Sequence, residues 1–171
     1  MKQKNNQTKE GFTLIELLLY ISLAAVILLT VSLFLSMLLN ARAKNQVVAE
    51  VDQQGAQVMQ LITQTIRNAE AINSPTQGNQ VNSLSLDVVD AANDPTIFDL
   101  VANTIRISEG VSVPVVLTSA RIIVSNLIFY NLTRNNTQGT IRIQYTLTHI
   151  NPGSRNEFDY SKTYYGSATL R

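Results

Sequence analysis

A nearly continuous apolar run occupies the N-terminal part of the chain, from Phe12 to Leu39. Between Leu14 and Leu39 the only charged residue is Glu16. At about 1.5 Å per residue, a helix over this segment is long enough to cross the ~30 Å hydrocarbon core of a bilayer. A buried core helix fits less well, because a small protein offers few places to cover a helix that is apolar on every face. The run therefore predicts a transmembrane helix.

The apolar residues that follow Leu39 are spaced differently. They recur three, four and seven positions apart, which is the periodicity of an amphipathic helix, at Val47, Val51, Val58, Ile62, Ala69 and Ile72. No proline interrupts residues 1–74, so both patterns can lie on one helix that reaches about Ile72. Gly55 is its weak point, because glycine costs a helix interior roughly 1 kcal/mol relative to alanine. Ser74-Pro75 and Gly78 are expected to end the helix.

Beyond Leu84 the apolar period falls to two, as in strands with one buried face. The alternating segments are 84–88, 105–107, 111–117, 121–132, 141–148 and 158–170. Pro114 predicts an edge strand or a bulge in the third segment, and a phase slip near Ser125-Asn126 predicts a bulge in the fourth. The last two segments, joined through Asn151-Pro152-Gly153, predict an antiparallel hairpin.

These patterns predict an α+β fold, in which a long N-terminal helix packs on an antiparallel β-sheet head. The helix is apolar in its first half and amphipathic in its second half. We divide the chain into a leader peptide (1–11), a transmembrane or assembly helix (12–40), an amphipathic helix (41–73) and a β-rich globular head (74–171).

Composition narrows the possible functions. The chain has no cysteine, which excludes a disulfide framework, a zinc ribbon and a thiol nucleophile. Its formal net charge of +1 gives no footprint for nucleic acid, so no nucleic-acid partner is expected. No phosphate-binding glycine loop or catalytic triad is present, and we expect neither enzymatic activity nor a cofactor. A lone strand histidine, His149, is expected to be a surface or packing residue. The aspartates of 87–99 could bind calcium, but aspartates are also common in turns.

Residues 9–18, which read KEGFTLIELL, carry the most specific motif in the sequence. A short basic leader with Lys2, Lys4 and Lys9 precedes a glycine and a phenylalanine, and a carboxylate follows inside the apolar helix. This pattern resembles the type IV prepilin family, which includes the pseudopilins of type II secretion. The resemblance implies that a prepilin peptidase cuts between Gly11 and Phe12 and then methylates the new Phe12 amine.

The resemblance also implies a role for Glu16. A charged side chain in the middle of a bilayer costs roughly 2.5–3.5 kcal/mol, and less near the interface. In the family, the partner that offsets this cost is the N-terminal amine of a neighbouring subunit, here Phe12. Phe12 and Glu16 are thus the expected subunit-assembly residues. The alternative is a glutamate that only reaches the cytoplasmic headgroups.

Residues 53–69 resemble the corresponding helix of J-type minor pseudopilins and W-type minor pilins. The chain also lacks the kinking proline of major pilins near Leu33 and their C-terminal cysteine pair. We therefore expect a minor subunit of a type IV pilus or a type II secretion pseudopilus. Pilus or pseudopilus, and tip or shaft, stay open.

The expected partners are the prepilin peptidase, other pilin-like subunits, the inner-membrane assembly platform and membrane lipid. The expected location is the inner membrane, crossed once with the N-terminus cytoplasmic, and then a surface or periplasmic filament. The alternative is a membrane-tethered binding or sensor domain that never polymerises. A DNA-uptake pilin fits less well, because the arginines of the head are scattered among a similar number of acids.

Overall fold

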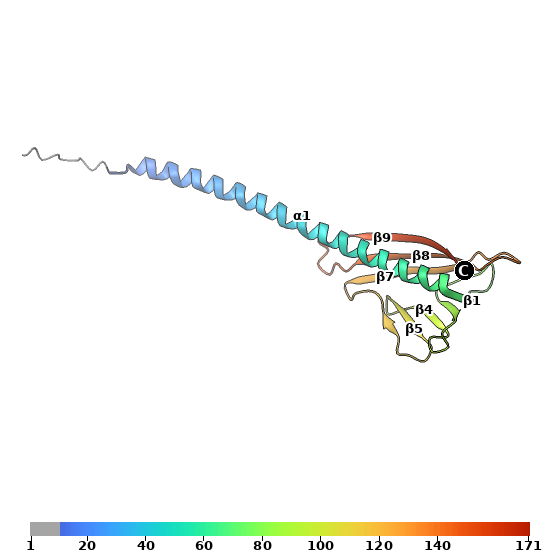
Figure 1. Ribbon diagram of the computed structural model, residues 1–171. Helices are drawn as coiled ribbons and strands as arrows, with labels where there is room; N and C mark the ends of the chain where they lie inside the picture. The colour runs from blue at the N-terminus through green and yellow to red at the C-terminus, as the bar shows by residue number, and fades with distance from the viewer. Residues whose placement is uncertain (1–10) are drawn as a thin grey trace, which may run out of the picture. The chain divides into compact units, whose positions relative to one another are not determined.

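In the computed structural model, which describes residues 11–171, one helix precedes a head of antiparallel strands (Figure 1). Helix α1 runs from Leu14 to Asn68. The chain divides into two compact units, Met1–Arg42 and Ala43–Arg171, so α1 begins in the first unit and ends in the second. The second unit holds the amphipathic half of α1 together with all of the strands.

The head contains two antiparallel sheets. The five-stranded sheet has the order β1 (Ala69–Ser74), β3 (Leu84–Val88), β4 (Thr96–Val101), β5 (Thr104–Glu109) and β6 (Val115–Val116). The four-stranded sheet has the order β2 (Gln80–Val81), β7 (Ile122–Asn131), β8 (Thr140–His149) and β9 (Ser161–Thr169). A long N-terminal helix followed by antiparallel sheets confirms the predicted α+β class.

The predicted end of the helix was wrong by a few residues. α1 stops at Asn68, and the chain continues directly into β1, where Ala69 pairs with Val88 and Ile72 pairs with Leu86. Ala69 is buried, as are the stripe residues Ile62 and Ile66 of the helix before it. Its apolar side chain therefore did not mark the change from helical spacing to strand spacing. Ser74-Pro75 accordingly ends a strand and not a helix.

The strand predictions were mostly confirmed. The bulge in β7 lies where the phase slips, with the register shifting between Ser125 and Ile128 and Asn126 at a φ of 54°. The segment 111–117 was wrong in length, because only Val115–Val116 pairs with β5, while Val111 and Val113 are exposed. Pro114, which has no N–H to donate, stands between Val113 and the paired Val115. β2 and β4 were not predicted as strands.

The core forms where the amphipathic half of α1 meets the strands. Four stripe residues of the helix, Val51, Val58, Ile62 and Ile66, are fully or almost fully buried. They join a single cluster with strand residues from both sheets, among them Leu84, Phe98, Phe129, Ile143 and Leu147. Removal of this apolar surface from water is the main force that holds the helix to the head.

Gly55 lets α1 approach β9 closely. A Cβ at position 55 would lie 2.1 Å from Cζ of Tyr164, so only glycine leaves room for that ring. The hydroxyl of Tyr164 donates to the carbonyl of Val51 at 3.0 Å, and the hydroxyl of Tyr145 donates to the carbonyl of Gly55 at 2.6 Å. Burial raises the pKa of the Tyr145 hydroxyl above its ordinary value of 10.0. The glycine that looked like a weak point is thus a packing requirement.

A charged contact borders the same region. The Asp52 carboxylate accepts a hydrogen bond from Lys162 Nζ at 2.9 Å, and it shares the single proton of the Tyr164 hydroxyl, 3.1 Å away, with the Val51 carbonyl. The Lys162 ammonium, as hydrogen-bond donor and as nearby charge, lowers the pKa of Asp52 below its ordinary value of 3.8. Asp52 and Lys162 are both well exposed, so the pair adds little stability.

Candidate functional site

Gly11 and Phe12 lie just before the first turn of α1. Neither residue is helical, both are exposed, and the Phe12 side chain is 71% exposed. A Cβ at Gly11 would meet no atom within 4 Å. A non-helical, exposed backbone at this position is open to an enzyme that must bind it. Of the expected leader peptide (1–11), residues 1–10 lie outside the described residues.

Thr13 caps the N-terminus of α1. Its Oγ1 accepts a hydrogen bond from the N–H of Glu16 at 3.4 Å, and its carbonyl accepts one from the N–H of Leu17 at 3.1 Å. The pattern Thr-x-x-Glu over residues 13–16 is the spacing of a capping box, in which the glutamate would bond back to the N–H of the cap residue. The sequence contains this signal, and our sequence analysis missed it.

Glu16 completes only half of that capping box. Its Oε1 accepts a hydrogen bond from the Tyr20 hydroxyl at 3.4 Å, one turn further along the helix. The Tyr20 ring in turn lies 5.8 Å from the Phe12 ring, centre to centre. The start of α1 therefore brings together Phe12, Glu16 and Tyr20. Glu16 and Phe12 were predicted as site residues, and Tyr20 was not.

The surroundings of Glu16 make its negative charge available to a partner. Every residue from 11 to 42 is exposed, including the leucines, isoleucines and valines on all sides of α1. By length and composition this helix can cross a membrane. An anionic side chain in the first turn also interacts favourably with the positive end of the helix dipole. A cation placed beside Glu16 in an apolar environment would be bound strongly.

Helix, head and N-terminal segment together define an α+β protein whose apolar N-terminal helix fits a membrane anchor. Residues 6–32 match the family model described as the prokaryotic N-terminal methylation motif. That motif is the hallmark of type IV prepilin-like and pseudopilin-like proteins, so the predicted resemblance is confirmed over the N-terminal segment. No curated protein and no solved structure matches the chain.

The motif bears on the role and the partners of the protein. It favours a structural role over a catalytic one. It also implies processing by a prepilin peptidase and assembly with other pilin-like subunits. The match ends at residue 32, so the head must be understood from its own structure.

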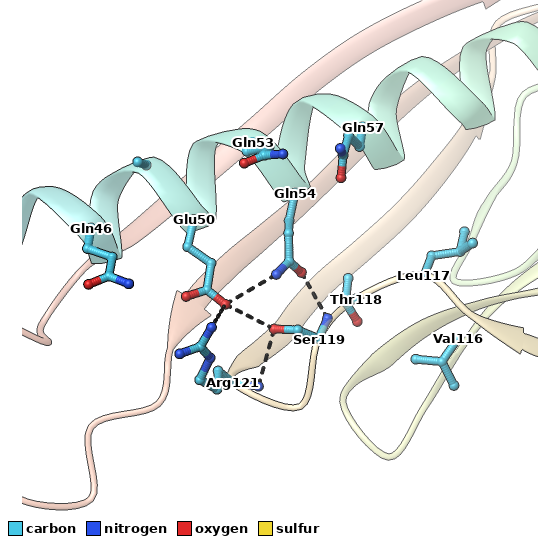
Figure 2. A pocket seen from close by; sticks show the side chains of 11 residues that line it. Gln46, Glu50, Gln53, Gln54, Gln57, Val116, Leu117, Thr118, Ser119 and Arg121 are labelled. Carbon is cyan, nitrogen blue, oxygen red and sulfur yellow. Dashed lines mark hydrogen bonds and ion pairs between the residues drawn. The ribbon is translucent and has the colours of Figure 1, made fainter.

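A polar cavity of about 640 Å³ lies in the head between α1 and the loop that follows β6 (Figure 2). At its centre Glu50 accepts hydrogen bonds from Gln54 and Ser119 and forms an ion pair with Arg121 at 3.2 Å. The N–H of Ser119 donates to Oε1 of Gln54 at 2.8 Å. Figure 2 shows these four side chains pointing toward one another, which ties the loop to the helix. This network is structural, because its polar groups already bond to one another.

The remaining candidates of the head also make internal contacts. His149 is buried, its Nδ1 lies 2.8 Å from the carbonyl of Ile150, and its ring stacks on Phe158, so it is a packing residue as expected. Asp90 accepts a hydrogen bond from the N–H of Ala92 in the turn, and Asp94 accepts one from the N–H of Val88 at the end of β3. Asp99 binds Arg106 with both oxygens. Within residues 11–171 no group of three or more histidines, aspartates and glutamates is placed to hold a metal ion.

Proposed function

We propose that this protein is a minor subunit of a type IV pilus or a type II secretion pseudopilus. A prepilin peptidase cuts the chain between Gly11 and Phe12 and methylates the Phe12 amine. The mature protein then waits in the inner membrane, with its head outside, and joins a filament through α1. The observation that carries the proposal is a single carboxylate, Glu16, in the first turn of α1, where all apolar side chains from Leu14 to Leu39 are exposed among the described residues.

Assembly is proposed to use the charge of Glu16. After cleavage the Phe12 amine is a cation, and Glu16 of one subunit pairs with the Phe12 amine of the next. In a low-dielectric environment this pair fixes the axial register of two neighbouring helices. The Tyr20 hydroxyl holds the carboxylate with one long hydrogen bond, which leaves its remaining lone pairs free for the incoming amine.

The leader cleavage has a direct test. Mass spectrometry of the protein from its native membrane should find a mature chain that begins with N-methylated Phe12. Gly11→Leu should leave the full-length precursor, because a bulky side chain next to the scissile bond does not fit a site shaped for glycine. Gly153→Leu, at an exposed turn glycine of the head, is the control that should mature normally. Normal maturation of Gly11→Leu would show that the cleavage assignment is wrong.

A membrane-tethered binding or sensor domain is the second candidate. Two observations favour it: Ala43–Arg171 forms a compact unit with its own core, and Glu16 already has a partner in Tyr20. A tethered domain needs no neighbouring subunit and no cleavage. It would therefore keep the residues before Phe12 in the membrane, which the same mass measurement detects.

A further inference from the structure

Within residues 11–171, the outer edge of β9 carries a row of main-chain groups that pair with no other strand. β9 is the last strand of its sheet and pairs with β8 alone. The N–H of Leu170 donates to the carbonyl of Gly139, and the N–H of His149 donates to the carbonyl of Tyr160. The register between these two contacts is unbroken, so the main-chain N–H and C=O groups of the even-numbered residues of β9 point toward β8. The main-chain groups that point away from the sheet belong to Ser161, Thr163, Tyr165, Ser167 and Thr169.

The other sheet edges of the head are protected against pairing with a further strand. β2 and β6 have two residues each, and Pro114 directly precedes β6. β1 is longer, but its register shifts twice along β3. Short edges, prolines and bulges are the usual ways in which proteins prevent edge-to-edge association. β9 has none of these: it is nine residues long, regular and free of proline.

The charge along β9 is low and already neutralised. Its only charged residue is Lys162, whose Nζ lies 2.9 Å from the Asp52 carboxylate of α1. The main-chain groups of Lys162 point toward β8, so none of the residues whose main-chain groups point outward is charged. An uncharged strand could therefore pair with β9 without leaving a charge of β9 itself unpaired.

Two cavities lie along this edge, between β9 and α1. The first, of about 540 Å³, is mostly apolar and is lined by Ala56, Met59 and Thr63 of α1 and by Tyr164 and Tyr165. The second, of about 520 Å³, continues past Arg67 to Ser167 and Thr169. Tyr165 itself is 68% exposed. A strand added to β9 would place every second side chain on the side of the sheet that packs against α1, near these cavities.

We propose that β9 is a docking edge for an extended segment of another polypeptide, uncharged and apolar at alternate positions. Main-chain hydrogen bonds to the outward groups of β9 would supply the affinity. The alternate apolar side chains, seated between α1 and β9, would supply the specificity. The segment would thus become a fifth strand of the sheet that now contains β2, β7, β8 and β9.

A different chain fits this edge better than a second copy does, a point that rests on the proposed function. Symmetric pairing of two identical edges is antiparallel, so it would turn the Ala43 ends of the two helices in opposite directions. Two subunits anchored in one membrane need these ends on the same side. In a filament the extended segment would accordingly come from a neighbouring subunit of a different kind.

Binding of defined peptides to the full chain in detergent micelles tests the proposal. The probe is a fluorescent heptapeptide of alternating threonine and valine, measured by anisotropy. Methylating the amide nitrogens of only the threonines, or of only the valines, blocks one edge of the peptide and also prevents its aggregation. At least one singly blocked form should bind, and a form methylated at every residue should not. Equal binding of all forms, or binding of none, would overturn the proposal.

The protein side of the test is Ser167→Pro, compared with Ser167→Ala. Proline removes an outward N–H of β9 without removing a hydrogen bond to β8, whereas alanine removes only the side chain. Ser167→Pro should weaken peptide binding by about tenfold, the effect of one lost main-chain hydrogen bond, and Ser167→Ala should not. Equal affinities of these two variants would contradict the proposal.

Sedimentation of the same variants tests whether a second copy of the chain occupies the edge of β9. A dimer of the full chain that Ser167→Pro dissociates and Ser167→Ala retains would assign the edge to self-association and overturn the proposed partner. None of these measurements depends on filaments. If peptide binding holds while Glu16 proves irrelevant to assembly, the proposed function fails and the docking edge stands.

Discussion

Residues 14–39 and residues 47–66 lie on the same helix, and both segments are rich in leucine, isoleucine and valine. In the first segment every side chain is exposed, whereas in the second the apolar stripe is buried under the two sheets. The first segment is apolar on all sides and has a single charge, while the second is apolar on one side only. The head therefore covers the apolar side of residues 47–66, whereas the apolar side chains of residues 14–39 need a membrane or other subunits to cover them.

The contrast predicts that truncating an isoleucine destabilises the head in the second half of the helix and does not in the first half. Ile62 is fully buried and Ile27 is 53% exposed, and both lie within α1. Ile62→Ala should lower the free energy of unfolding of the head by about 2–5 kcal/mol, because it leaves a cavity in the core. Ile27→Ala should leave that free energy unchanged. Denaturant unfolding of the full chain in micelles, followed by the near-ultraviolet circular dichroism of the tyrosines, measures both. A similar loss in the two variants would break the contrast.

A second prediction concerns the contact between α1 and β9. Gly55→Ala should destabilise the head by about 1–3 kcal/mol, although alanine favours helix, because the new Cβ overlaps the Tyr164 ring. Combining it with Tyr164→Ala should remove most of the clash, so the two changes should not be additive. A double-mutant cycle in the same unfolding assay provides the check. Stabilisation by Gly55→Ala alone would mean that the helix can move away from β9 at little cost.

The smallest expected effect concerns Asp52. Because Lys162 holds the pKa of the folded Asp52 below 3.8, the folded state binds fewer protons than the unfolded state. The resulting stability is fully present above pH 3.8 and is lost as the pH falls through the folded pKa. For an exposed pair it should not exceed about 1 kcal/mol. Asp52→Asn and Lys162→Met should both flatten the acid limb of the stability curve, measured as the denaturation midpoint against pH. An unchanged limb in either variant would contradict this contribution.

The sequence predicted those features that follow from periodicity over many residues. The stripe of Val51, Val58 and Ile62 and the alternation of Ile141, Ile143, Tyr145 and Leu147 are both buried as expected. Each depends on a repeating pattern that local sequence carries in full. Gly11, Phe12 and Glu16 were proposed from a contiguous motif, which lies within the residues 6–32 that match a family model, and their roles stay predictions.

The features that could not be predicted depend on contacts between distant residues. Nothing near Ala69 shows that Val88 will pair with it and end the helix. Gly55 needs a glycine only because Tyr164, far along the chain, lies against it. The unpaired edge of β9 likewise follows from the order of strands in its sheet, which the alternation of side chains does not specify. Contacts between distant residues therefore determine these features, for which local sequence preferences give no signal.

The most direct test of the account is the incorporation of Glu16 variants into filaments in the native host. Glu16→Gln keeps the size of the side chain and an oxygen that can accept the Tyr20 hydrogen bond, but it removes the charge. The account predicts that Glu16→Gln and Glu16→Ala are both inserted, cleaved and folded, and that neither enters filaments or cross-links to a neighbouring helix. Tyr20→Phe, which removes only the local hydrogen bond, should assemble normally. Wild-type incorporation of Glu16→Ala would contradict the proposed assembly mechanism.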